Sequence, residues 1–136
     1  MNITIIDGHG GMLGAQLVKE ITSNFPEVSI TAIGTNSVAT AAMLKAGANE
    51  GATGENPTVV ACRKANVIIG PIGIVIADSL CGEITPKMAV AVGQANAVRI
   101  LIPMNKCDNL IAGAGDIPTS TLIEDVILKL KKAINA

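Results

Sequence analysis

The residues best suited to chemistry form a glycine-rich stretch near the start of the chain. A run of β-branched residues leads into Gly8, Gly10, Gly11 and Gly14, and amphipathic sequence begins at Met12. Glycines let a backbone approach a phosphate closely, and a helix that begins there offers free N–H groups and a positive dipole end. This pattern predicts a strand, a turn and a helix that bind the phosphate of a nucleotide. The alternative is a tight turn that packs a helix on a strand without any ligand.

The spacing of the glycines is that of a variant fingerprint, Gly8-x-x-Gly11-x-x-Gly14. Gly8-x-Gly10 also begins the commoner dinucleotide fingerprint, but Leu13 stands where its third glycine belongs. No Gly-Lys-Ser/Thr follows these glycines, which excludes a P-loop.

The candidate binding residues lie where strands are expected to end. In and beside the glycine turn they are Asp7, Gly8, His9, Gly10, Gly11, Met12, Leu13 and Gly14. After the second and fourth expected strands they are Thr35, Asn36, Ser37, Gly70 and Pro71. The polar side chains of Thr35, Asn36 and Ser37 could bond ribose or phosphate oxygens, although Asn36 or Ser37 serves equally well as a helix cap.

Catalytic candidates are few. His9 is the only histidine. Because an imidazole can donate or accept a proton, it is a candidate acid, base or phosphate contact as well as an ordinary exposed loop residue. Cys81 with His9 would form a nucleophile and base, which Asp78 or Glu83 could orient. Asp7 could contact a sugar or a metal, or could simply fix its own loop. No spacing of His, Cys, Asp and Glu predicts a metal site.

Bulk composition narrows the function classes. The 136 residues suit one domain, residues 1–136. Only 15% are charged and 49% are hydrophobic, which predicts that a partner subunit covers apolar surface in a homo-oligomer. A net charge of −1 and a single aromatic residue, Phe25, argue against nucleic-acid binding. The absence of tyrosine excludes the Tyr-x-x-x-Lys pair of short-chain dehydrogenases.

Cysteine usage and hydropathy indicate the compartment. Cys62, Cys81 and Cys107 are odd in number and lack C-x-x-C spacing, which argues against a disulfide framework and a zinc site. We find no apolar run long enough to span a bilayer and no secretory signal, and therefore expect no membrane partner and a cytoplasmic location.

Strand and helix patterns alternate along the chain. Strands are predicted at residues 3–6, 28–33, 50–53, 67–70 and 98–102, and helices at residues 12–23, 38–46, 57–64, 86–95 and 118–134. Helix starts are predicted from Asn56 with Pro57, Thr85 with Pro86, and a capping box of Thr121 and Glu124. A turn is expected at residues 105–108, with an extra edge strand possible at residues 109–113. The alternation predicts a doubly wound, mainly parallel α/β sheet of order 3-2-1-4-5 with helices on both faces.

Residues 3–70 resemble the first half of an NAD(P)-type Rossmann domain. The resemblance implies that Gly8, Gly11 and Gly14 face a pyrophosphate, with NAD or NADP as the cofactor. Such domains end the second strand with an acidic residue, whereas residues 34–37 read Gly-Thr-Asn-Ser, so NAD, NADP, a mononucleotide and no ligand all stay open. Residues 2–14, together with residues 102–107, also resemble a small family of stand-alone bacterial proteins of unknown function.

The long connection at residues 71–84 is expected beside the glycine turn, as a binding loop or, through residues 72–80, as a subunit contact. Three functions remain open. The first is a nucleotide-binding protein. The second is a minimal oxidoreductase or transferase whose pocket is completed by this connection or by another subunit. The third is an assembly protein without a ligand.

Overall fold

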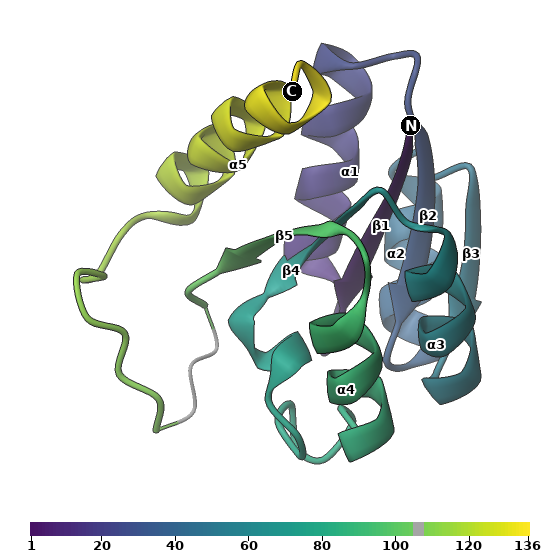
Figure 1. The fold of residues 1–136 in the computed structure, drawn as a ribbon, viewed down its shortest axis with the longest axis vertical. Helices are drawn as coiled ribbons and strands as arrows, with labels where there is room; N and C mark the ends of the chain where they lie inside the picture. The colour runs from purple at the N-terminus through teal and green to yellow at the C-terminus, as the bar shows by residue number, and fades with distance from the viewer. Residues whose placement is uncertain (105–107) are drawn as a thin grey trace.

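The fold is a parallel α/β sheet between two layers of helices. A computed structural model describes residues 1–104 and 108–136, and most of the expected turn at residues 105–108 lies outside them. Within the described residues the sheet has five strands in the order β3-β2-β1-β4-β5 (Figure 1). The predicted fold class and strand order are therefore confirmed.

Strand β1, Asn2–Asp7, is the centre of this sheet. It pairs in parallel with β2, Ser29–Gly34, and with β4, Val67–Pro71. The outer strands are β3, Glu50–Thr53, and β5, Val98–Ile102, also parallel to their neighbours. The expectation that the first and fourth strands are central parallel neighbours is confirmed, and their apolar runs follow from burial on both faces.

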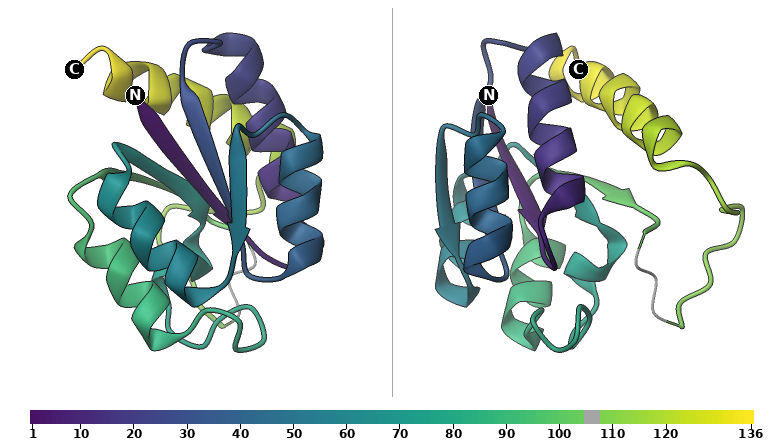
Figure 2. Two further views of the ribbon diagram at one scale, coloured as in Figure 1. Left: turned by 90° about the vertical axis from the view of Figure 1, so that its right-hand side faces the viewer. Right: turned by 180° about the vertical axis from the view of Figure 1, so that it is seen from behind.

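Helices cover both faces of the sheet (Figure 2). One layer holds α1, Met12–Asn24, α2, Ser37–Lys45, and α5, Thr119–Ile134. The other holds α3, Glu55–Lys64, and α4, Pro86–Gln94. A short 3-10 turn, η1 at Ile72–Val75, follows β4.

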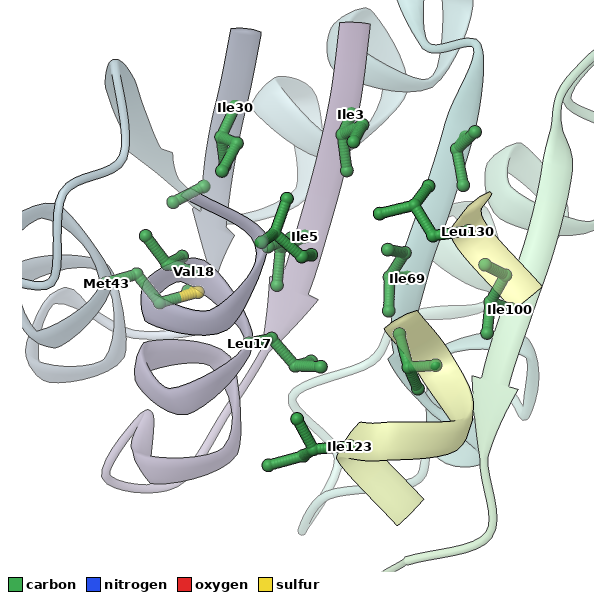
Figure 3. Close-up of a cluster of buried hydrophobic side chains, with 14 of the residues drawn as sticks. Ile3, Ile5, Leu17, Val18, Ile30, Met43, Ile69, Ile100, Ile123 and Leu130 are labelled. Carbon is green, nitrogen blue, oxygen red and sulfur yellow. The ribbon is translucent and has the colours of Figure 1, made fainter. Parts of the chain in front are cut away.

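Alternate residues of β1 contribute to separate cores on the two faces. Ile3 and Ile5 are fully buried in the core beneath α1 and α5, whereas Ile6 is buried in the core beneath α3 and α4. Figure 3 shows Ile5, Leu17 of α1 and Leu130 of α5 among the side chains of the first core. This period of two is what a strand covered on both sides requires.

The predicted helix starts have mixed outcomes. The Oγ1 atom of Thr85 accepts the Met88 amide at 3.2 Å, which confirms that cap. The start at Asn56 is wrong, because α3 begins at Glu55 after Gly54, whose φ of 99° suits glycine. The capping box is also wrong, since Thr121 lies inside α5.

The predicted edge strand at residues 109–113 is absent from the structure, which has no strand in residues 108–118. The Ala114 amide instead donates to the Ile111 carbonyl at 3.1 Å in a turn, and Gly113 has φ of 83°. Leu110 is 96% exposed and Ile111 only half-buried, so no described strand or helix covers the Leu110 side chain. Residues 108–118, in the link from β5 to α5, therefore run over the surface, away from the sheet (Figure 1).

Leucine truncation on α5 tests how this helix holds its place. Leu130 is completely buried, so Leu130→Ala should lower the free energy of unfolding by about 2–5 kcal/mol through lost contacts and a cavity. Leu128 on the same helix is 61% exposed, and Leu128→Ala should change it by less than about 0.5 kcal/mol. Urea denaturation followed by circular dichroism measures both; equal effects would contradict the docking of α5 described here.

Candidate functional site

A buried carboxylate holds the glycine turn in place. Asp7 at the end of β1 is 3% exposed, and its Oδ1 accepts the Gly8 amide at 2.8 Å. Its Oδ2 accepts the Gly14 amide, in the first turn of α1, at 2.7 Å. One side chain thus ties the strand, the turn and the helix together, which is the loop-fixing role among those considered for Asp7.

Burial governs the protonation of this carboxyl group. Desolvation raises the pKa of Asp7 above its ordinary value of 3.8, although the amide hydrogen bonds from Gly14 and Gly8 and the charge of His9 each lower it. The folded protein therefore binds this proton more tightly than the unfolded chain does.

The missing side chains of Gly11 and Gly14 face α2. A Cβ atom built on Gly11 would lie 2.7 Å from the Cα of Ala39 and 2.8 Å from its carbonyl oxygen. A Cβ on Gly14 would lie 2.9 Å from Cγ of Met43. Gly11 also has φ of +74°. Close contact between α1 and α2 and a left-handed backbone therefore account for these two glycines, and their contact with a pyrophosphate stays a prediction.

The outer side of the turn is open. A Cβ built on Gly10 would meet nothing closer than Cγ of Met12, at 4.0 Å. The amides of His9, Gly10, Met12 and Leu13 donate no hydrogen bond to another described residue, whereas those of the remaining turn residues do. These four amides at the start of α1, which we call the amide face, are the donors of the turn that have no partner among the described residues.

The polar residues after β2 are brought to the glycine turn. The Oδ1 atom of Asn36 accepts the Ala39 amide at 2.9 Å, which confirms the cap of α2, and its Nδ2 donates to the His9 carbonyl at 3.0 Å. The Thr35 hydroxyl donates to Glu83 Oε1 at 2.9 Å. Asn36 therefore serves both as a cap and as a link to the turn.

Of the other candidates after strands, Ser37 is exposed at the first position of α2. Gly70 and Pro71 are buried within β4 instead of lining an opening. A Cβ on Gly70 would clash with the Ile6 carbonyl of the neighbouring strand, so close strand packing accounts for that glycine.

Residues 76–84, the covering segment, lie over Gly8. A Cβ on Gly8 would be 2.9 Å from Cδ1 of Leu80 and 3.5 Å from Oε1 of Glu83. The segment is closed on itself, since the Asp78 amide donates to the Ile84 carbonyl at 2.7 Å. Leu80 and Ile84 are buried in the core beneath α4, so the segment is packed onto the domain at both of these points.

The covering segment has an unusual backbone. Asp78, Leu80 and Cys81 have φ values of 67°, 55° and 57°, and Gly82 follows with 84°. Non-glycine residues adopt this left-handed conformation infrequently, and a run of them carries a cost in conformational energy. Leu80, within this stretch, is 1% exposed, and the burial of its side chain favours the conformation.

The predicted catalytic residues are not assembled. His9 and Cys81 are both exposed, and no hydrogen bond joins them in the described part of the chain. Asp78 is exposed as well. Cys62 is buried in α3, and desolvation raises the pKa of its thiol to about 11. The protonated thiol is therefore favoured over the reactive thiolate.

Metal ligands are not gathered either: residues 1–104 and 108–136 contain no group of three or more His, Cys, Asp or Glu side chains placed to hold an ion. Three hollows on the described surface lie away from the glycine turn. One is formed by α1 and α5, another by the sheet beside α3, and a third by the link and the start of α5.

The apolar run at residues 72–80 is only partly available for a subunit contact. Ile74 and Leu80 are buried in the domain's own core, whereas Ile72, Val75 and Ile76 are half-buried. Among the described residues, no helix combines the length and hydropathy that a membrane span requires.

This architecture, with a glycine turn after its central strand, defines a Rossmann-like α/β protein. The family model described as "Domain of unknown function (DUF3842)" matches residues 2–135, and the chain belongs to that family. A search of curated proteins finds no match.

Among solved structures, the chain is similar to a dodecameric FMN-dependent UbiX-like decarboxylase from Escherichia coli O157:H7, with 18% sequence identity and a TM-score of 0.49. The alignment covers 98% of this chain and 76% of that one. At this level the likeness says nothing about what this chain binds.

Glycine replacement tests the close contact between α1 and α2. A non-glycine residue in the left-handed conformation costs about 1–3 kcal/mol. Gly11→Ala should lower the free energy of unfolding by more than this, because the new Cβ also meets the backbone of Ala39. The matched control is Gly113→Ala, since Gly113 has φ of +83° and open space around it. Urea denaturation should give a smaller loss for the control; equal losses would show that backbone strain alone requires Gly11.

The raised pKa of Asp7 sets the direction of a pH effect. Stability linked to this proton is present below pH 3.8 and is lost as the pH rises through the higher folded-state pKa. Asp7→Asn removes the titration. The free energy of unfolding of the wild type relative to Asp7→Asn should therefore fall as the pH is raised from about 3.5 to 6.5 in a denaturant series. A rise would mean that the amide hydrogen bonds outweigh desolvation.

Proposed function

We propose that the chain binds a nucleotide or dinucleotide, with a phosphate held by the amide face at the start of α1. The observation that carries the proposal is the open space at Gly10 beside the unbonded amides of His9, Gly10, Met12 and Leu13. Backbone N–H groups at a helix N-terminus, together with the helix dipole, form a favourable anion site.

The position of the amide face in the sheet supports the proposal. The chain leaves β1 toward α1 on one face and leaves β4 toward α4 on the other, so the two connections diverge at the carboxyl ends of neighbouring strands. In open α/β sheets ligands bind at such a switch point. The exposed His9 side chain at the tip of the turn is then a candidate phosphate contact.

The enzyme alternative, an oxidoreductase or transferase, stays a prediction without a catalytic group to support it. NAD and NADP remain candidates as ligands. Homo-oligomer formation also stays a prediction, favoured by the low charged content and by the 96% exposure of Leu110.

A second candidate function is assembly without a ligand. It is favoured by the contacts that account for Gly11 and Gly14, since packing against α2 explains both glycines without a phosphate. The two functions differ in what nucleotides do to the stability of the folded protein.

Gly10 provides the sharper test of nucleotide binding. A ligand at about 100 times its dissociation constant should stabilise the wild type by about 2.7 kcal/mol, seen as a higher melting temperature. We expect such a shift with at least one of NAD, NADP, AMP, ATP and FMN. Gly10→Ala should leave the melting temperature without ligand unchanged, because the added methyl group enters open space, and should remove most of the shift.

The control is Gly115→Ala, at another glycine with open surroundings and no left-handed backbone. It should keep the full ligand shift. No shift with any of the compounds in the wild type would overturn nucleotide binding and leave assembly as the function.

A further inference from the structure

We propose that Glu83 recognises the ribose of the bound nucleotide, so that the ligand is a ribonucleotide with an unmodified 2′-hydroxyl. The inference rests on the proposed function and names the class of ligand for the same site. It starts from a contact between two connections that follow different strands, the one after β2 and the one after β4.

The carboxylate of Glu83 stands at the end of β2. Its Oε1 atom accepts the Thr35 hydroxyl at 2.9 Å, and the Nδ2 of Asn36 lies 3.5 Å from Oε1 and 3.4 Å from Oε2. Dinucleotide-binding domains bond the ribose hydroxyls with an acidic residue that ends this strand. This chain has no acidic residue there, and the fold supplies one from the covering segment instead.

The same carboxylate lies next to the glycine turn. Oε1 of Glu83 is 3.5 Å from the position that a Cβ on Gly8 would take. Asn36, which contacts Glu83, also donates to the His9 carbonyl within the turn. A phosphate on the amide face and a sugar against Glu83 would therefore be neighbours, as they are in one nucleotide.

Glu83 retains the capacity to accept further hydrogen bonds. An ionised carboxylate offers about four lone-pair sites. Thr35 uses one of them at a normal distance, and the Asn36 contacts are at the long end of the range. Glu83 is only half-buried, so a vicinal diol could reach the remaining sites while Thr35 holds the carboxylate in position.

The carboxylate of Glu83 should make the site prefer a ribose with a 2′-hydroxyl. A 2′-phosphate would bring a second negative charge close to Glu83 and would be disfavoured, whereas a 2′-hydroxyl donates to the carboxylate. A 2′-deoxyribose leaves the carboxylate without that donor. NAD should therefore bind more tightly than NADP, and ATP more tightly than 2′-deoxy-ATP.

The opposite role for Glu83 is that of a plug. Glu83 and Leu80 fill the space above Gly8, and a ligand that entered there would have to displace them. Ribose recognition predicts that loss of the carboxylate reduces the preference for a 2′-hydroxyl, whereas a plug predicts that this preference does not depend on the carboxylate, so one set of titrations decides between them.

The test is calorimetric titration of the full chain with ATP, 2′-deoxy-ATP, NAD and NADP. The variant is Glu83→Gln, which keeps an oxygen for Thr35 and loses the charge. The control is Glu27→Gln. This exposed carboxylate lies just before β2, at the amino-terminal end of the strand, whereas the glycine turn lies at the carboxyl ends of the strands.

In the wild type we expect ATP to bind about tenfold more tightly than 2′-deoxy-ATP, the size of effect typical of a hydrogen bond to a charged group. Glu83→Gln should reduce this ratio to about threefold or less. Glu83→Gln should also reduce the ratio of the affinity for NAD to that for NADP, whereas Glu27→Gln should change neither affinity ratio. A purely structural role would weaken all four ligands together and leave both ratios unchanged, which would overturn the inference.

Two further results are decisive. Tighter binding of every nucleotide by Glu83→Gln, with both ratios unchanged, would show that the carboxylate hinders the ligand without contacting its ribose, and would overturn the inference while leaving the proposed function intact. No binding of any of the four by the wild type, with no shift in the wider panel, would overturn the proposed function itself.

Discussion

The buried carboxylate of Asp7 is the interaction on which the glycine turn depends. A carboxylate costs free energy when it leaves water, and here two backbone amides offset part of that cost. Because its oxygens bond amides on both sides of the turn, the strand and the helix cannot move apart without exposing unpaired polar groups. The direction in which α1 leaves β1 is therefore set from inside the protein.

The inner and outer sides of the turn have different tasks. The inner side is filled by Asp7 and by the contacts of Gly11 and Gly14 with α2, so it needs no ligand to keep its shape. The outer side at Gly10 carries amides that donate no hydrogen bond to another described residue. A turn that is already in place loses little conformational freedom when it binds an anion, and this preorganisation favours affinity.

Much of the architecture could be predicted from local sequence. Alternating strand and helix patterns were sufficient for the strand order, and Thr85 and Asn36 marked their helix starts, because these features depend on nearby residues. The failures were also local. Leu110 is left exposed, and α3 begins after Gly54, two residues before the predicted cap at Asn56.

The site was less predictable because its contacts are long-range. Sequence position placed Thr35 and Asn36 at the end of a strand, but nothing in the spacing indicated that Glu83, 48 residues beyond Thr35, would meet them. The glycine pattern likewise did not distinguish glycines required by helix packing from one that leaves space. That distinction needs the position of α2 relative to α1, which only the folded chain provides.

Residues 108–118, in the link between β5 and α5, lie on the surface, and this has an evolutionary consequence. The entropy of closing a loop grows only with the logarithm of its length, so doubling such a link costs about 0.6 kcal/mol. The buried residues of α5 hold the helix on the sheet independently of this link. Homologous chains can therefore gain or lose residues between positions 108 and 118 and keep the same domain, and this region is the natural place for an insertion that adds a new surface.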